Sequence, residues 1–299
     1  MSLTQDIRDA FSRRDNALNQ LIILNAVVFA VMIIVRAVLH IAQQDGTYEL
    51  IRRQLELSSS IPVLLRHPWT LLTYAFLHQD FFHILFNMLN LYWFGQIIRE
   101  YLGDRRLVSL YVLGALAGAA FFLLAFNFLP VFRPQLGIPV IGASASVTAI
   151  IVAAATLLPD YTFMLFIIGA VKIKWIALVV VLISLAGING GNPGGEITHL
   201  GGALLGFVFV KQLKAGRDIG RPVVAVGDWL GRLFQRSPAM KVTHRSPVAV
   251  GRTTAAAGKA APSTTPPEEV DLILDKISRS GYESLSKDEK QKLFRASQQ

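Results

Sequence analysis

Long apolar segments dominate the first two thirds of the chain. They cover residues 21–39, 81–98, 107–129, 141–158, 175–188 and 197–210. A helix needs about 20 mostly apolar residues to cross a bilayer, so the pattern predicts an all-α membrane protein with six transmembrane helices. Within 161–188, Lys172 and Lys174 divide an apolar run. We expect a cytoplasmic hairpin followed by a short span there, and the alternative is one long helix.

Basic residues mark one side of the predicted membrane domain. They precede the first span, lie between the second and third, and follow the sixth: Arg8, Arg13, Arg14, Arg99, Arg105, Arg106, Lys211, Lys214, Arg217 and Arg221. Lys and Arg are enriched in short cytoplasmic loops, so both termini are expected in the cytoplasm. Residues 1–20 are polar and lack a small-residue cleavage site after an apolar stretch. They read as a cytoplasmic lead-in rather than a signal peptide.

Four regions follow from these patterns. The lead-in covers 1–20 and the six-span domain 21–214. Residues 215–267 form a linker that is first basic, with eight Lys and Arg against two Asp over 216–260, and then rich in Ala, Thr and Pro. Residues 268–299 form a small cytoplasmic helical hairpin, in which Gly281 ends the first helix and Ser286 with Glu289 starts the second as a capping box. So short a pair has little core, and we expect it to dock on the membrane domain, a sister subunit or a partner.

The loop over residues 43–77 is long enough for structure of its own. Its segment Tyr48–Leu57 is partly amphipathic and predicts a helix in the membrane interface.

Composition narrows the class of protein. Hydrophobic residues make up 53% of the 299 and charged residues 16%, against about 25% charged in soluble domains. The net charge of +9 fits cytoplasmic loops and lipid headgroups better than nucleic acid, so membrane lipids are the expected partner. The absence of cysteine excludes disulfides and a thiol nucleophile.

Two polar residues at predicted membrane depth carry the candidate chemistry. Ser144 lies in Gly-Ala-Ser-Ala-Ser, where Gly142 and the alanines permit close approach. His199 lies on the last span, with Gly202 and Gly206 on the same helix face. Small residues let membrane helices pack closely, which would bring His199 to Ser144. A histidine can activate a serine hydroxyl as a general base, although such a serine is more often a packing residue.

A third cluster lies at the start of the second span. His83 and Asn87 are four residues apart, share a helix face and both carry hydrogen-bond donors, as stabilisation of an oxyanion requires. His78 and His83 are five apart and no His-Glu-x-x-His is present. A zinc hydrolase is therefore disfavoured, and we expect no metal and no cofactor.

Together these segments resemble the rhomboid family of intramembrane serine proteases over roughly residues 58–214. The resemblance implies a Ser144 nucleophile, a His199 base and no third acid, with oxyanion stabilisation by His83, Asn87 and the Ser144 backbone N–H. It implies structural roles for His78, Gly142, Gly202 and Gly206. Three positions depart from the family pattern, which are Ala145 after the nucleophile, Thr148 in place of an aromatic that stacks on the histidine, and Thr70 in place of arginine after Trp69.

The resemblance thus implies a serine endopeptidase that cleaves transmembrane segments of membrane proteins. We expect a multi-pass protein of the bacterial inner membrane. The alternative is a non-catalytic relative that binds transmembrane clients for quality control, but such relatives usually lack the serine or the histidine. A transporter is a weaker option, because neither a relay of paired ionisable groups nor a broken-helix repeat is visible.

Overall fold

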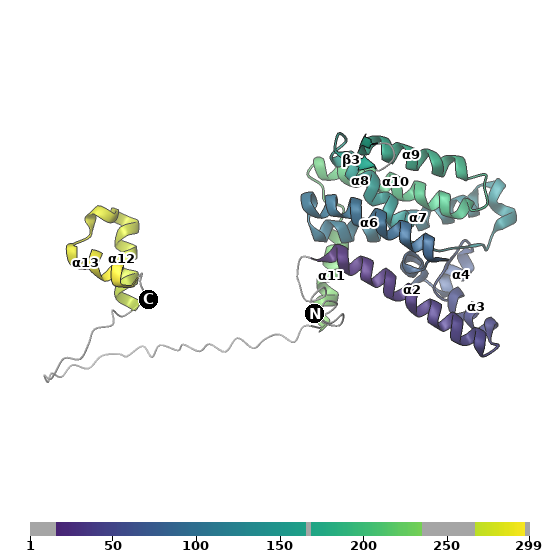
Figure 1. The fold of residues 1–299 in the computed structure, drawn as a ribbon, viewed down its shortest axis with the longest axis horizontal. Helices are drawn as coiled ribbons and strands as arrows, with labels where there is room; N and C mark the ends of the chain where they lie inside the picture. The colour runs from purple at the N-terminus through teal and green to yellow at the C-terminus, as the bar shows by residue number, and fades with distance from the viewer. Residues whose placement is uncertain (1–15, 166–168, 235–266, 297–299) are drawn as a thin grey trace. The chain divides into compact units, whose positions relative to one another are not determined.

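The computed structural model describes residues 16–165, 169–234 and 267–296 (Figure 1). Most of the predicted lead-in and the Ala, Thr and Pro-rich part of the linker lie outside these ranges. The chain divides into two units at Ser237 and Pro238. Each unit is described by itself.

Each of the six predicted apolar segments coincides with a helix of the first unit. These helices are α2 (Ala17–Ile41), α6 (Phe81–Leu102), α7 (Asp104–Phe128), α8 (Ser144–Leu157), α9 (Ile173–Gly187) and α10 (Pro193–Lys214). Among the described helices, α2, α6 and α7 are long and apolar enough to cross a membrane, while α8 and α9 are shorter apolar helices. The described part of the fold is therefore mostly helical and contains candidate membrane spans, as predicted.

Helix α8 lies at the centre of the bundle and contacts α6, α7, α9 and α10. Small side chains make this possible, since Ala149, Ala153 and Ala154 are fully buried beside Ile150. Neighbouring labels in Figure 1 show α8 and α10 side by side between α7 and α9. The fold thus encloses the helix that begins with Ser144 on several sides.

The loop between α2 and α6 is built from short elements. They are α3 (Asp45–Arg53), β1 (Leu57–Ser58), α4 (Ile61–Arg66), α5 (Thr70–Thr73) and the 3₁₀ turn η1 (Tyr74–Phe76). Strand β1 pairs antiparallel with β2 (Pro139–Val140), which follows the 3₁₀ turn η2 (Pro130–Gln135). The predicted helix over Tyr48–Leu57 thus ends earlier, at Arg53, because Leu57 pairs with Val140 in the sheet.

The segment over residues 161–188 forms the predicted hairpin, followed by a short apolar helix rather than one long helix. Strands β3 (Thr162–Leu165) and β4 (Gly169–Lys172) pair antiparallel immediately before α9. Both lysines pair with the Asp160 carboxylate, with Nζ to Oδ1 distances of 3.0 Å for Lys172 and 2.9 Å for Lys174. Hydrogen bonds from Lys174 and Lys172 lower the pKa of Asp160 to about 2.

Residues 221–234, within the predicted linker, form a helix that the sequence analysis did not anticipate. Helix α11 (Arg221–Phe234) packs against α7.

In the second unit, α12 (Pro267–Ser280) and the 3₁₀ turn η3 (Tyr282–Ser284) precede α13 (Lys287–Ala296). Gly281, with φ of 77°, follows α12, and the predicted capping box forms, with the Ser286 N–H donating to Glu289 Oε2 at 2.7 Å.

Candidate active site

One cavity of about 600 Å³ collects the predicted reacting groups. Ser144 at the start of α8, His199 on α10, and His83 and Asn87 on α6 all line it. Residues of α9 complete the lining. Three segments far apart in the sequence therefore present a hydroxyl, an imidazole and two further donors to the same space.

Gly142 shapes the approach to Ser144. Its φ is 130°, which L side chains rarely adopt, and its N–H donates to the Tyr74 carbonyl at 2.9 Å. A Cβ at this position would lie 2.8 Å from Nε2 of His83 and 3.4 Å from Oγ of Ser144. Only glycine leaves this space open beside His83 and Ser144.

The two serines of the Gly-Ala-Ser-Ala-Ser run have different surroundings. Ser144 is partly exposed and lines the cavity. Ser146 is fully buried, and its hydroxyl donates to the Tyr111 carbonyl at 2.6 Å. Ser146 therefore has a packing role, and only Ser144 is available to a bound molecule.

His83 and Asn87 line the cavity from α6. The N–H of Gln79 donates to Nδ1 of His83 at 3.4 Å, so the neutral ring carries its proton on Nε2, the atom that faces Gly142. The Asn87 side chain donates one N–H to the His83 carbonyl at 2.8 Å, and its amide carries a second N–H. Both side chains thus have a donor suited to an anionic oxygen.

His78 is not among the residues that line this cavity. It is 8% exposed, and its ring meets the ring of His83 edge to face with centroids 5.0 Å apart. This placement supports the structural role that the resemblance implies.

Gly202 and Gly206 bring α10 against α8. A Cβ on Gly202 would overlap the carbonyl oxygen of Ala145, and one on Gly206 would overlap that of Ala149. The two backbones are thus in direct contact, as the spacing of these glycines predicts. The contact fixes His199 near the start of α8.

The surroundings of His199 differ from the expectation of no third acid. Nδ1 of His199 lies 3.0 Å from Oγ of Ser184 and 3.3 Å from Oε2 of Glu196. Neither residue was predicted from the sequence. Glu196 could have been found, since it precedes His199 by three positions on the same helix face. Ser184 lies on another helix, and no local pattern marks it.

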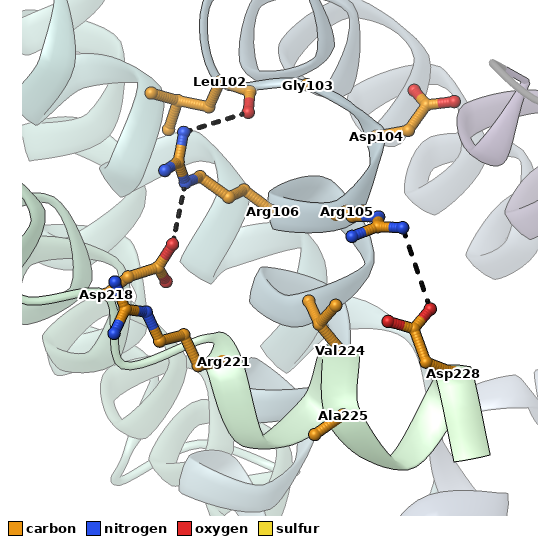
Figure 2. A pocket seen from close by; sticks show the side chains of 10 residues that line it. All are labelled: Leu102, Gly103, Asp104, Arg105, Arg106, Asp218, Arg221, Val224, Ala225 and Asp228. Atoms are coloured by element: carbon orange, nitrogen blue, oxygen red, sulfur yellow. Dashed lines mark hydrogen bonds and ion pairs between the residues drawn. The ribbon is translucent and has the colours of Figure 1, made fainter. Parts of the chain in front are cut away.

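A second, larger cavity of about 1010 Å³ lies where α11 meets the start of α7 (Figure 2). Four of its charged side chains form two ion pairs. Arg106 Nε lies 3.1 Å from Asp218 Oδ2, and Arg105 Nη2 lies 3.8 Å from Asp228 Oδ1. This cavity contains no serine, cysteine or histidine, so it is a poorer candidate for covalent catalysis despite its size.

Over the described ranges, no three His, Asp or Glu side chains gather as a metal site requires.

Two parts of the chain match known protein families. Residues 65–214 match the rhomboid domain family, and residues 264–299 match a family of unknown function (DUF6576). RHOMBOID-like protein 12, mitochondrial, from Arabidopsis thaliana is 31% identical over 158 residues, which are 50% of this chain and 47% of that protein. Rhomboid protein 1, mitochondrial, from Saccharomyces cerevisiae is 28% identical over 52% of this chain and 45% of its own length.

A third relative is Rhomboid-like protein 16, chloroplastic, from Arabidopsis thaliana, at 29% identity over 50% of each chain. The chain thus spans about half the length of the curated relatives it matches. The match to the family domain covers half of the chain and includes every residue of the candidate site. The chain belongs to the rhomboid family.

Proposed function

We propose that this protein is an intramembrane serine endopeptidase that cleaves transmembrane segments of other membrane proteins. The observation that carries the proposal is the single cavity shared by Ser144, His199, His83 and Asn87. The chemistry needs a nucleophile, a base and oxyanion donors within one site. No cofactor or metal is required for it.

In the proposed reaction, His199 Nε2 accepts the Ser144 proton while Oγ attacks a peptide carbonyl. The tetrahedral oxyanion accepts hydrogen bonds from His83, Asn87 and the backbone N–H of Ser144. His199 then returns the proton to the leaving amine, and water hydrolyses the acyl-enzyme. Ser144 begins α8, so its N–H is not committed within that helix.

The walls of the cavity support an apolar substrate. Phe82 and Phe86 of α6 and Ile183 of α9 line it and are more than half exposed, at 66%, 60% and 62%. A helical segment within lipid keeps its carbonyls in backbone hydrogen bonds, so it must unwind locally before attack. We therefore propose single-span substrates with small or helix-breaking residues near the outer membrane face.

We also propose a membrane topology for the chain. Six transmembrane segments with both termini in the cytoplasm put the basic loops on the cytoplasmic side. The three relatives carry mitochondrial or chloroplastic names, and the bacterial inner membrane stays a prediction for this chain. Residues 268–299 remain proposed as a docking module.

Membrane lipids are a proposed partner of α11. Val226, Trp229 and Leu230 lie on one face of this helix and are 56%, 60% and 45% exposed. Asp228 points to Arg105 of α7 (Figure 2). An amphipathic helix with an exposed tryptophan is typical of the membrane interface, which supports a helix lying on the cytoplasmic surface.

The alternative remains a non-catalytic protein that binds transmembrane clients. Purified full-length protein in proteoliposomes with a tagged single-span substrate separates the two. We expect the wild type to produce two fragments and the Ser144→Ala and His199→Ala variants to retain intact substrate. Equal capture of intact substrate by all three proteins, without fragments, would favour client binding.

A further inference from the structure

The ring nitrogen of His199 that faces away from the proposed reaction has two polar neighbours. Nδ1 contacts the Ser184 hydroxyl at 3.0 Å and the Glu196 carboxylate at 3.3 Å. Both neighbours are largely shielded, since Ser184 is 2% exposed and the Glu196 side chain is 21% exposed. A carboxylate within a membrane bundle is energetically costly. Such groups are therefore usually paired and mark functional sites.

The surrounding backbone is shaped to hold this carboxylate in place. A Cβ on Gly187 of α9 would lie 2.8 Å from Cδ of Glu196, so only glycine at this position leaves room for the acid. Asn192 caps α10 by accepting the N–H of Gly195 at 3.0 Å, which fixes the turn that bears Glu196. The acid also lies in the first turn of α10, where the helix dipole favours negative charge.

The contacts select one form of the imidazole. A carboxylate only accepts hydrogen bonds, so Nδ1 of a neutral His199 must carry the proton to bond with Glu196. The lone pair is then on Nε2, the atom that has to accept the Ser144 proton. A hydroxyl both accepts and donates, so Ser184 can accept from the same Nδ1–H.

We propose that Glu196 and Ser184 are positioning residues that hold His199 in its basic tautomer and fix its ring. This inference rests on the proposed protease function. It also accounts for Thr148, which lines the cavity where the family pattern has an aromatic that stacks on the histidine. In this chain, hydrogen bonds at Nδ1 take over the orientation that stacking provides elsewhere.

Kinetics on the full chain in detergent test the proposal. Glutamine at 196 can donate to Nδ1 or accept from it, so Glu196→Gln no longer selects a tautomer. We expect Glu196→Gln to lower kcat roughly 10–100-fold, the range seen when partners that orient metal-bound histidines are removed. KM should change little, and Ser184→Ala should lower kcat by less. Glu49→Gln, on the exposed helix α3, is the matched control and should behave as wild type.

The tautomer is also measurable without activity. Nitrogen NMR of histidine-labelled Ser144→Ala protein, assigned with His199→Gln, reports which ring nitrogen carries the proton. We expect a proton on Nδ1 of His199, and a mixture of tautomers once Glu196→Gln is added. If Glu196→Gln does not fold, the same spectrum of Ser184→Ala decides. The proposal is overturned if the variant has an unchanged kcat and an unchanged spectrum. It is also overturned if only KM rises, because that would mean that the residue contacts the substrate. Lack of cleavage by wild type with the expected spectrum rejects the protease function alone.

Discussion

Gly202 of α10 lies directly against the carbonyl of Ala145 of α8, one residue after the proposed nucleophile. This contact connects helix packing to the geometry of the site, because any side chain at 202 pushes the two backbones apart. Such a shift changes the position of Ser144 relative to His199.

The first prediction concerns this contact. Gly202→Ala should abolish measurable cleavage and destabilise the protein by about 1–3 kcal/mol or more, the usual cost of overpacking. Thermal unfolding in detergent and substrate cleavage measure the two effects. Gly46→Ala is the control, since a Cβ there meets nothing within 4 Å. Wild-type activity of Gly202→Ala would show that close helix contact is not needed at the site.

The second prediction separates the two serines. Ser146→Ala removes a buried hydrogen bond to Tyr111 and should cost about 1 kcal/mol of stability, while cleavage continues. Ser144→Ala should keep the stability of the wild type and lose cleavage. The reverse pattern would assign the nucleophile to Ser146.

The third prediction assigns Asn87 to oxyanion stabilisation. Loss of one such donor typically lowers kcat on the order of 10²–10³-fold, and Asn87→Ala should show this with little change in KM. Asn90 also lines the cavity, is partly exposed and donates to the Phe86 carbonyl, and the Asn90→Ala variant serves as the comparison. A higher KM with unchanged kcat in Asn87→Ala would indicate substrate docking instead.

The fourth prediction concerns the C-terminal end of the chain. Deletion of residues 235–299 should leave cleavage in detergent unchanged, because the proposed reacting groups all lie in the first unit. Deletion from residue 217 onward also removes the ion pair of Asp218 with Arg106 and the hydrogen bond of Ser109 to the Gly220 carbonyl. It should therefore lower the unfolding temperature. Loss of cleavage in the shorter deletion, with folding intact, would give the tail a role in turnover.

Much of the fold was predictable from the sequence because membrane helices leave strong apolar patterns. The six apolar segments all correspond to helices, and Lys172 with Lys174 marked the hairpin before α9. Helix α11 was not predicted because its apolar positions lie within a basic stretch, and that basic charge favoured a linker. Its pairing with α7 through Arg105 and Asp228 is a tertiary contact without a local signature.

The candidate site was likewise predictable only in part. Ser144, His83, Asn87 and His199 were chosen from local motifs, and the structure brings them into one cavity. The contact of Ser184 with His199 joins α9 to α10 and depends on how these helices pack. Periodicity along one helix contains no information about such a partner.

The most direct test of the central claim is labelling of the full-length protein in detergent with a fluorophosphonate probe, followed by mass spectrometry of the labelled peptide. This reagent reacts with a serine only when a base activates the hydroxyl, so it reports the chemistry without any substrate. We predict stoichiometric labelling at Ser144 in the wild type and in Ser146→Ala, and none in Ser144→Ala or His199→Ala. A folded wild-type protein that stays unlabelled, or labelling that persists in Ser144→Ala, would contradict the assignment of Ser144 as an activated nucleophile.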